Sequence, residues 1–447
     1  MIVLVGFVAA LSGLLIGYNT AVIAPALDFL IKDFHLGPIM QGIVVSAVLL
    51  GGFIGSLCAG GFIRHTGERP VLFGTAFLFA LGAAGSAWSG SVTELVAWRM
   101  IAGFGVGAAT MVAPLYVSET TPARMRGAFV SIIQLAITIG ILLSYLTGAL
   151  WTPSGSWRLM LLVGAIPGVI MLAILVIMPE SPRWYLSRGR RAEAERAHQR
   201  LTGGHDEPLP AQIEETARAS WRDLFNDRNR MVLILATGLF AFANLSGIDA
   251  ILYYAPVIFG HVGFGGTLGP ILATVGIGTV NVVATVVAMA LIDRLGRRPL
   301  LIGGLIPMAA SLIVLGIALM VGQGAAWSNI LAVSCLGLFV FAFGVSLGPL
   351  PYVLMSELFP LALRGAGMGI ASAAAWGVNV LVSLTFPIMV EAMGVALVFG
   401  LYGLISLVAL AFVVALVPET RGRSLETIEA NLARGRAVRD LGMPLAP

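Results

Sequence analysis

The sequence predicts an all-α membrane protein, and three observations lead to this class. The hydrophobic fraction is 58% and the charged fraction only 11%, which together exclude a soluble globule. Twelve apolar segments are long enough for a helix to cross the ~30 Å hydrocarbon core, which takes about 20 residues. The sequence lacks the alternation over ~10 residues that is typical of membrane β-barrels.

The twelve apolar segments fall into two groups of six. We expect membrane spans at residues 2–27, 40–63, 71–90, 93–117, 128–150, 157–178, 231–259, 268–292, 299–321, 329–355, 365–390 and 394–417. The chain begins directly with an apolar helix, without a basic region or cleavage site, so we interpret 2–27 as a span and not a signal peptide. Between the groups lies a hydrophilic stretch with ten arginines and eight acidic residues from Arg183 to Arg230. The predicted domains are six-helix bundles at 1–178 and 231–417, a helical linker at 179–230 and a tail at 418–447.

The positions of the basic residues predict the orientation in the membrane. With twelve spans, both termini face the same side as the linker, and 23 of the 26 lysines and arginines lie on that side. The positive-inside rule therefore predicts that the termini and the linker are cytoplasmic. The same asymmetry explains the basic isoelectric point, which gives no support to nucleic-acid binding.

Three charged motifs occur twice in the same order, at offsets of 229 to 239 residues. The pairs are Gly67-Glu68-Arg69-Pro70 with Gly296-Arg297-Arg298-Pro299, Ser118-Glu119-x-x-Pro122-x-x-x-Arg126-Gly127 with Ser356-Glu357-x-x-Pro360-x-x-x-Arg364-Gly365, and Pro179-Glu180-Ser181 with Pro418-Glu419-Thr420. Six helices per half give both copies the same orientation, so the repeats are parallel. Parallel repeats of this kind are typical of transporters in which two bundles rock about a site between them.

The duplicated charges lie at the predicted cytoplasmic ends of the spans, where they could form a gate. Arginines and glutamates could pair across the two bundles when the inner side is closed, and separate when it opens. Alternatively, the arginines only fix the orientation in the membrane, although the positive-inside rule does not require the recurring glutamates. The candidate gate residues are Glu119, Arg126, Glu180, Arg183, Arg294, Arg298, Glu357, Arg364 and Glu419.

With these motifs the chain resembles the sugar porter family of the major facilitator superfamily, which includes facilitative glucose transporters and bacterial proton–sugar symporters. The resemblance covers the whole length, and its motifs are Gly17-Tyr18-Asn19-Thr20-Ala21-Val22-Ile23, Arg99-x-x-x-Gly103-x-Gly105-x-Gly107, Pro179-Glu180-Ser181-Pro182-Arg183-Trp184, Asp293-Arg294-Leu295-Gly296-Arg297-Arg298 and Pro418-Glu419-Thr420-Arg421-Gly422-Arg423-Ser424. In the loop of the first half, Arg64 stands where an Asp is usual and Glu68 where a basic residue is. The resemblance implies transport of a monosaccharide, a hexose or a pentose, by alternating access.

Sugar binding needs neutral donors and acceptors and an aromatic face, so we looked for polar side chains within spans. The resemblance assigns sugar contact to Gln134, Asn281 and Trp376, and Asn379 lies near the middle of the same span as Trp376. Alternatively, Gln134 and Asn281 could join helices to each other, and Trp376 could serve packing alone.

The seventh span departs from the family pattern of two glutamines followed by an asparagine. Those positions hold Ala243, Asn244 and Asp249, and the register is given by the intact Tyr253-Tyr254-Ala255-Pro256. In the tenth span Tyr352 replaces a frequent tryptophan, and the prolines of Gly348-Pro349-Leu350-Pro351 should interrupt the helix. The candidate substrate contacts are Gln134, Asn244, Asp249, Tyr253, Asn281, Tyr352, Trp376 and Asn379. The resulting pocket is less polar than a usual hexose site.

The position of Asn19 bears on energy coupling. Proton-coupled members of the family carry Asp there, paired with the arginine that matches Arg99, whereas facilitative members have Asn. Because asparagine does not titrate, we expect uncoupled facilitated diffusion, or uniport. Against this stands Asp249, the only carboxylate well inside a span, where a charge costs about 2.5–3.5 kcal/mol. Asp249 could be a relocated proton carrier, a substrate acceptor or a partner of Arg99.

We therefore predict a monosaccharide uniporter in the plasma or inner membrane. Proton symport through Asp249 and a facilitator of polyols or other small polar solutes remain alternatives, while a sugar sensor would need a longer tail. We expect no cofactor and no metal, because the sequence has neither a phosphate-binding loop nor a His/Cys cluster. No nucleophile–base pair indicates an enzyme. We expect a monomer whose partners are the sugar and the lipid bilayer. Gly13 with Gly17, and Gly103 with Gly107, predict faces for close helix packing.

Overall fold

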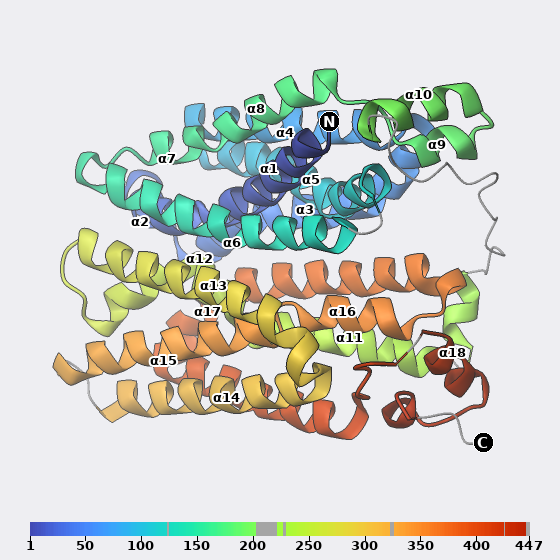
Figure 1. Ribbon diagram of the computed structural model, residues 1–447. Coiled ribbons are helices and arrows are strands. Elements are labelled where there is room, and N and C mark those ends of the chain that lie inside the picture. Colours follow the sequence, from blue (N-terminus) through green and yellow to red (C-terminus); the bar gives the residue numbers. More distant parts are fainter. Residues whose placement is uncertain (123–124, 203–220, 227–228, 322–325, 424, 444–447) are drawn as a thin grey trace. The chain divides into compact units, whose positions relative to one another are not determined.

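The computed structural model describes the chain except residues 123–124, 203–220, 227–228, 322–325, 424 and 444–447 (Figure 1). Within the described residues every regular element is a helix. The chain forms two compact units, Met1–Glu214 with Thr267–Gly278, and Glu215–Gly266 with Thr279–Pro447. Each unit is described by itself below.

The helices of the first unit follow the predicted spans, with extra turns and breaks. They are α1 (Ile2–Ala21), α2 (Ile23–Phe34), α3 (Pro38–Thr66), α4 (Glu68–Trp88), α5 (Val92–Thr120), α6 (Arg126–Trp151), η2 (Thr152–Ser154), α7 (Trp157–Val163) and α8 (Ala165–Ile177). Helix α2 continues seven residues beyond the expected end at 27. The predicted span was too short because hydropathy falls at charged residues such as Lys32, although the helix itself continues. It ends at His35, which has a left-handed backbone (φ 52°).

The second unit contains the predicted interruption and one that was not predicted. Its elements are η3 (Trp221–Phe225), α11 (Arg230–Leu245), α12 (Ile248–Val262), the part of α13 (Leu268–Leu295) that follows Gly278, α14 (Arg297–Val321), α15 (Ala326–Val345), α16 (Leu350–Leu358), α17 (Leu361–Leu416), α18 (Leu425–Ala433) and η4 (Val438–Asp440). The tenth span breaks at Gly348-Pro349, as the prolines predicted. The seventh breaks between α11 and α12 at Gly247, whose φ is 88°.

The number of spans agrees with the prediction of twelve. Eleven helices of the described residues are long and apolar enough to cross a membrane. The last of them extends over Leu363–Leu416, 54 residues, and contains a non-helical residue, Gly394 (φ 81°, ψ 155°). It therefore consists of two successive helices that meet where the eleventh and twelfth spans were expected to adjoin.

Three short helices lie within residues 179–230. They are η3, given above, and α9 (Pro182–Ser187) and α10 (Arg191–Thr202), of which the last two pack against each other at one end of the first unit (Figure 1). The exposed guanidinium of Arg190 donates two hydrogen bonds to Oε1 of Glu193, at 3.1 and 3.0 Å. These bonds lower the pKa of the Glu193 carboxyl. Residues 203–220 of the linker lie outside the described part of the chain.

The two predicted glycine faces lie at close helix contacts in the first unit. A Cβ atom on Gly107 of α5 would lie 1.8 Å from the carbonyl oxygen of Gly52 on α3, and one on Gly103 would lie 2.1 Å from that of Val48. On α1, a Cβ on Gly17 would lie 1.9 Å from the carbonyl oxygen of Ile137 in α6. Glycine is thus required where these backbones meet, and the packing hypothesis is confirmed.

We expect Gly107→Ala to lower the stability of the first unit by roughly 1–3 kcal/mol, the usual cost of overpacking, because the backbone of Gly52 cannot rotate away as a side chain would. The thermal unfolding temperature of the purified protein measures the loss. Gly61→Ala on α3 is the matched control, since nothing lies within 4 Å of its added Cβ. Equal unfolding temperatures for the two variants would contradict the close contact.

Candidate functional site

Asp249 is the centre of a polar group in the second unit. The positive φ of Gly247 starts a new helix, α12, and places Asp249 in its first turn, where the helix dipole favours a negative charge. The side chains of Tyr253, one turn later, and of Asn379 on α17 lie next to its carboxyl group. Oδ1 of Asn379 also accepts a hydrogen bond from Ser383 at 3.2 Å. Three of the candidate substrate contacts are therefore neighbours.

Aromatic side chains surround this group. Tyr352 on α16 is 53% exposed and packs edge-on against Phe240, with ring centroids 4.7 Å apart. The ring of Tyr402 covers Gly247, where a Cβ would lie 2.3 Å from its Cδ2. Both tyrosines lie near Asp249. Sequence reasoning missed Tyr402, whose hydroxyl is buried and has no hydrogen-bond partner among the described residues.

The other candidates of the second unit lie on three different helices. Asn244 on α11 donates a hydrogen bond from Nδ2 to the carbonyl oxygen of Phe240 at 2.7 Å, so its own helix already engages the amide. Asn281 on α13 is buried, and its Oδ1 lies 3.7 Å from the position of a Cβ on Gly344 of α15. Trp376 is half-buried on α17.

In the first unit, Gln134 is half-buried on α6. Asn19 on α1 and Arg99 on α5 are both buried. Nδ2 of Asn19 donates to the carbonyl oxygen of Leu15 at 3.0 Å, and Nε of Arg99 donates to that of Val44 on α3 at the same distance. A direct Asn19–Arg99 contact, and sugar contact by Gln134, stay predictions.

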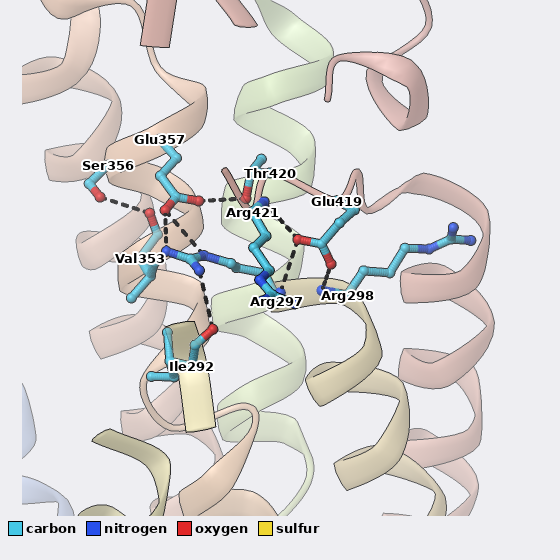
Figure 2. Close-up of polar contacts among 9 residues, drawn as sticks. All are labelled: Ile292, Arg297, Arg298, Val353, Ser356, Glu357, Glu419, Thr420 and Arg421. Carbon is cyan, nitrogen blue, oxygen red and sulfur yellow. Dashed lines mark hydrogen bonds and ion pairs between the residues drawn. The ribbon is translucent and has the colours of Figure 1, made fainter. Parts of the chain in front are cut away.

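The duplicated glutamate of the second unit, Glu419, caps a helix (Figure 2). Its carboxylate accepts hydrogen bonds from the backbone N–H groups of Arg297 (3.2 Å), Arg298 (3.0 Å) and Arg421 (2.8 Å). The first two belong to the start of α14, where unpaired N–H groups and the helix dipole favour an anion. Gly296 allows this approach, because its φ is 94° and a Cβ there would lie 2.7 Å from Oε2 of Glu419.

A second carboxylate, Glu357, joins the same helix ends. The guanidinium of Arg297 donates to Oε1 of Glu357 at 2.8 and 3.2 Å and to the carbonyl oxygen of Ile292 at 3.2 Å. The hydroxyl of Thr420 donates to the other oxygen of Glu357 at 2.5 Å (Figure 2). The ends of α13, α14 and α16 are therefore tied to the segment that follows α17.

The first unit repeats this arrangement with the matching residues. Oε1 of Glu180 accepts hydrogen bonds from the backbone N–H groups of Glu68 (3.2 Å), Arg69 (3.1 Å) and Ser181 (2.8 Å). The hydroxyl of Ser181 donates to Glu119, as that of Thr420 does to Glu357. The Arg69 guanidinium donates to the carbonyl oxygen of Leu175 at 2.8 Å. The predicted duplication thus extends to individual hydrogen bonds.

The structure adds Arg297 to the charged residues at the helix ends. Arg297 pairs with Glu357, whereas the sequence analysis chose Arg294, which is exposed at the end of α13. The repeat itself held the signal, since Arg297 follows the duplicated glycine. Arg183 is exposed, and Arg364 donates to the carbonyl oxygen of Phe359 at 3.4 Å.

Two points about the gate stay open to experiment. The side chain of Arg126 lies outside the described residues. Nη2 of Arg298 donates to the carbonyl oxygen of Val414 at 2.9 Å. This bond, like those given above for Glu119, Glu180, Glu357 and Glu419, joins parts of one unit. Pairing across the two bundles therefore stays a prediction.

Comparisons with known proteins agree with this arrangement. Residues 5–432 match the family described as "Sugar (and other) transporter". The chain is 40% identical to the putative metabolite transport protein YwtG of Bacillus subtilis (95% of this chain, 94% of the relative), and 36% identical to the galactose-proton symporter of Escherichia coli (98% and 95%). It is also similar to a solved structure of XylE from E. coli in a partially occluded inward-open conformation, with 32% identity, a TM-score of 0.80 and coverage of 95% of this chain and 99% of that one. The chain therefore belongs to the sugar transporter family of the major facilitator superfamily, a family of multi-pass membrane transporters.

Proposed function

We propose that this protein couples the uptake of a monosaccharide to the entry of protons, and that Asp249 carries the proton. The observation behind the proposal is a carboxyl group inside a membrane-spanning helix, with the side chains of Tyr253 and Asn379 next to it. Support also comes from the relatives, because one is named a galactose-proton symporter and XylE is described as a proton:xylose symporter. This proposal replaces uniport as our preferred hypothesis.

The coupling follows from the cost of a charge in the membrane. An ionised Asp249 in a closed, dry span costs about 2.5–3.5 kcal/mol. In the empty carrier Tyr253 and Asn379 beside it offset this cost, so the carrier can return, whereas a sugar that engages both side chains leaves the charge unsupported, and the protein then resists the closed state. A proton removes that charge, and the sugar then supplies hydroxyl partners for Asn379 and Tyr253. The doubly loaded protein closes and reopens on the other side more readily than either singly loaded form.

Alternating access would use the duplicated helix-end networks. Arg297, Glu357 and Glu419 stiffen one bundle and their counterparts the other, so that each bundle moves as a body during alternating access. We place both termini and the linker in the cytoplasm, from the distribution of basic residues, and the protein in the plasma or inner membrane.

Sugar contact by the predicted amides gives a test of the transport site. We expect Gln134→Ala and Asn281→Ala each to raise KM for the transported sugar about fivefold to tenfold, because one hydrogen bond contributes about 1 kcal/mol net. Counterflow in proteoliposomes with a panel of pentoses, hexoses and polyols measures KM and identifies the solute. Unchanged KM for both variants would exclude these amides from the site, and counterflow with polyols alone would favour a polyol facilitator.

Uniport is the second candidate function, and Asn19 favours it. Its buried amide donates to the carbonyl oxygen of Leu15 and cannot release a proton at the position where symporters of this family carry Asp. If Asp249 only accepts a hydrogen bond from the sugar, the protein equilibrates its substrate. Uptake that stops at the external concentration, with or without a protonophore, would establish this alternative.

A further inference from the structure

The direction of α12 depends on the backbone of one residue, Gly247. Its N–H donates to the carbonyl oxygen of Asn244 at 3.1 Å, which closes the end of α11, and its own carbonyl oxygen accepts from the N–H of Ile251 at 2.9 Å, which begins α12. The φ and ψ of Gly247 therefore set the angle between the two helices. Glycine adopts positive and negative φ about equally readily, so the backbone alone does not fix this angle.

The ring of Tyr402 covers Gly247 from another helix. The three atoms nearest to a Cβ on Gly247 all belong to this ring, with Cδ2 at 2.3 Å, Cε2 at 2.6 Å and Cγ at 2.7 Å. Tyr402 lies on the second of the two helices of α17 and is only 2% exposed. Its hydroxyl has no hydrogen-bond partner among the described residues, so the ring alone makes the contact. The flat ring is thus a wedge that limits the φ and ψ open to Gly247.

The other side-chain anchor of α12 lies farther along the helix. The hydroxyl of Tyr254 donates to the carbonyl oxygen of Ser383 at 2.8 Å, and its ring packs against that of Phe386 with centroids 4.9 Å apart. Tyr254 is about two turns beyond Gly247. The first turn of α12, which contains Asp249, therefore depends on the contact at the break.

A rotation at Gly247 would change the surroundings of Asp249. Asp249 follows Gly247 by two residues, and its neighbour Tyr253 would move with it because both belong to α12. Its other neighbour, Asn379, belongs to α17 and would stay behind. A functional group has to be held within about 0.5 Å of its working position, so even a small rotation would disturb the group.

We propose that Tyr402 is a positioning residue for proton coupling, whose ring, wedged against Gly247, sets the direction of α12 and holds Asp249 beside Asn379. Tyr402 acts through Gly247 and binds neither the proton nor the sugar, and no covalent step is involved. Its effect on transport rests on the coupling proposed above, whereas the wedge itself does not.

The number of protons that enter per sugar tests this role. Proteoliposomes with a pH-sensitive dye and radiolabelled sugar give the number. We expect Tyr402→Ala to lower it about twofold or more, because Asp249 is no longer held within about 0.5 Å of its working position. Tyr402→Phe keeps the ring and should keep the wild-type number.

Phe412→Ala is the matched control. Phe412 lies on the same helix as Tyr402, and its ring covers Gly238 of α11, where a Cβ would lie 2.7 Å from Cζ. Gly238, however, lies within an unbroken helix, so Phe412→Ala loses a ring and should still keep the wild-type number of protons per sugar.

Three results would overturn the proposal. They are an unchanged number in Tyr402→Ala, an equal loss in Phe412→Ala, which would assign Tyr402 to packing alone, and an equal loss in Tyr402→Phe, which would assign the effect to the hydroxyl. Tyr402→Leu, which keeps apolar volume without the flat ring, replaces Tyr402→Ala if that variant does not fold.

Distances between spin labels test the wedge without reference to protons. One label replaces the exposed Ile234 on α11 and the other the exposed His261 on α12, in full-length protein whose native cysteines have been replaced. The distribution of distances should broaden in Tyr402→Ala and not in Phe412→Ala, because only the first variant gives α12 several directions. Equal distributions in the two variants would refute the wedge. If wild type admits sugar without protons, the proposed coupling fails by itself, and this distribution still decides the role of Tyr402 at the break.

Discussion

Asp249→Asn is expected to abolish accumulation of sugar while leaving exchange of sugar across the membrane. One pH unit supplies about 1.4 kcal/mol per coupled proton, which sustains roughly tenfold accumulation. The variant keeps an acceptor oxygen for Asn379 and Tyr253 but has no proton to carry, so its accumulation ratio should fall to about one. Uptake into proteoliposomes with an imposed pH gradient measures the ratio, and counterflow without a gradient measures exchange.

The control for this experiment is a carboxyl group elsewhere in the same unit. Glu391 on α17 is exposed, so Glu391→Gln makes the same chemical change and should accumulate sugar as wild type does. If Asp249→Asn also accumulates sugar to the wild-type level, Asp249 is not the proton carrier. Loss of both exchange and accumulation would assign Asp249 to sugar binding instead.

The second large effect is expected at the carboxylate cap of the first unit. Glu180→Ala removes the oxygen that accepts three backbone N–H groups, and each buried donor left without a partner costs about 1–3 kcal/mol. We expect a loss of about 3 kcal/mol or more, seen as a lower unfolding temperature. Glu419→Ala should cost less, because Glu419 is more exposed than Glu180.

The matched controls for the caps are the amides. Glu180→Gln and Glu419→Gln keep a carbonyl oxygen that can accept the same N–H groups, so each should be more stable than the corresponding alanine variant. If Glu180→Ala unfolds at the wild-type temperature, the carboxylate does not hold α4 to the segment that follows α8, and the equivalence of the two caps fails.

Much of the fold could be predicted from the sequence because hydropathy and charge act over whole helices. The apolar length of each span, the charged stretch after Met178 and the duplicated motifs predicted twelve helices in two parallel repeats. Breaks within spans were harder to predict. The break before α16 could be predicted because Pro349 lacks a backbone N–H donor. The break of the seventh span at Gly247 could not, because hydropathy does not change there. The end of α2 was placed too early, because a helix can continue past its apolar part into Lys32 and Asp33.

The candidate sites were predicted as positions but not as contacts. Asp249, Tyr253 and Asn379 were chosen separately as polar groups in spans, and only the structure brings them together. Tyr402 was missed because a tyrosine in an apolar span has no distinctive sequence signal until its ring is found on Gly247. Arg297 belongs to the duplicated motif but was not chosen for the gate, because only the direction of its side chain shows that it pairs with Glu357.

Proton movement during sugar entry tests the proposed coupling most directly. Wild-type protein is reconstituted in proteoliposomes that hold a pH-sensitive dye, and sugar is added outside without an imposed gradient. We predict that the lumen becomes acidic in step with sugar entry, and that Asp249→Asn admits sugar without this acidification. Sugar entry into wild-type proteoliposomes with no change in lumenal pH would contradict the account and establish a uniporter.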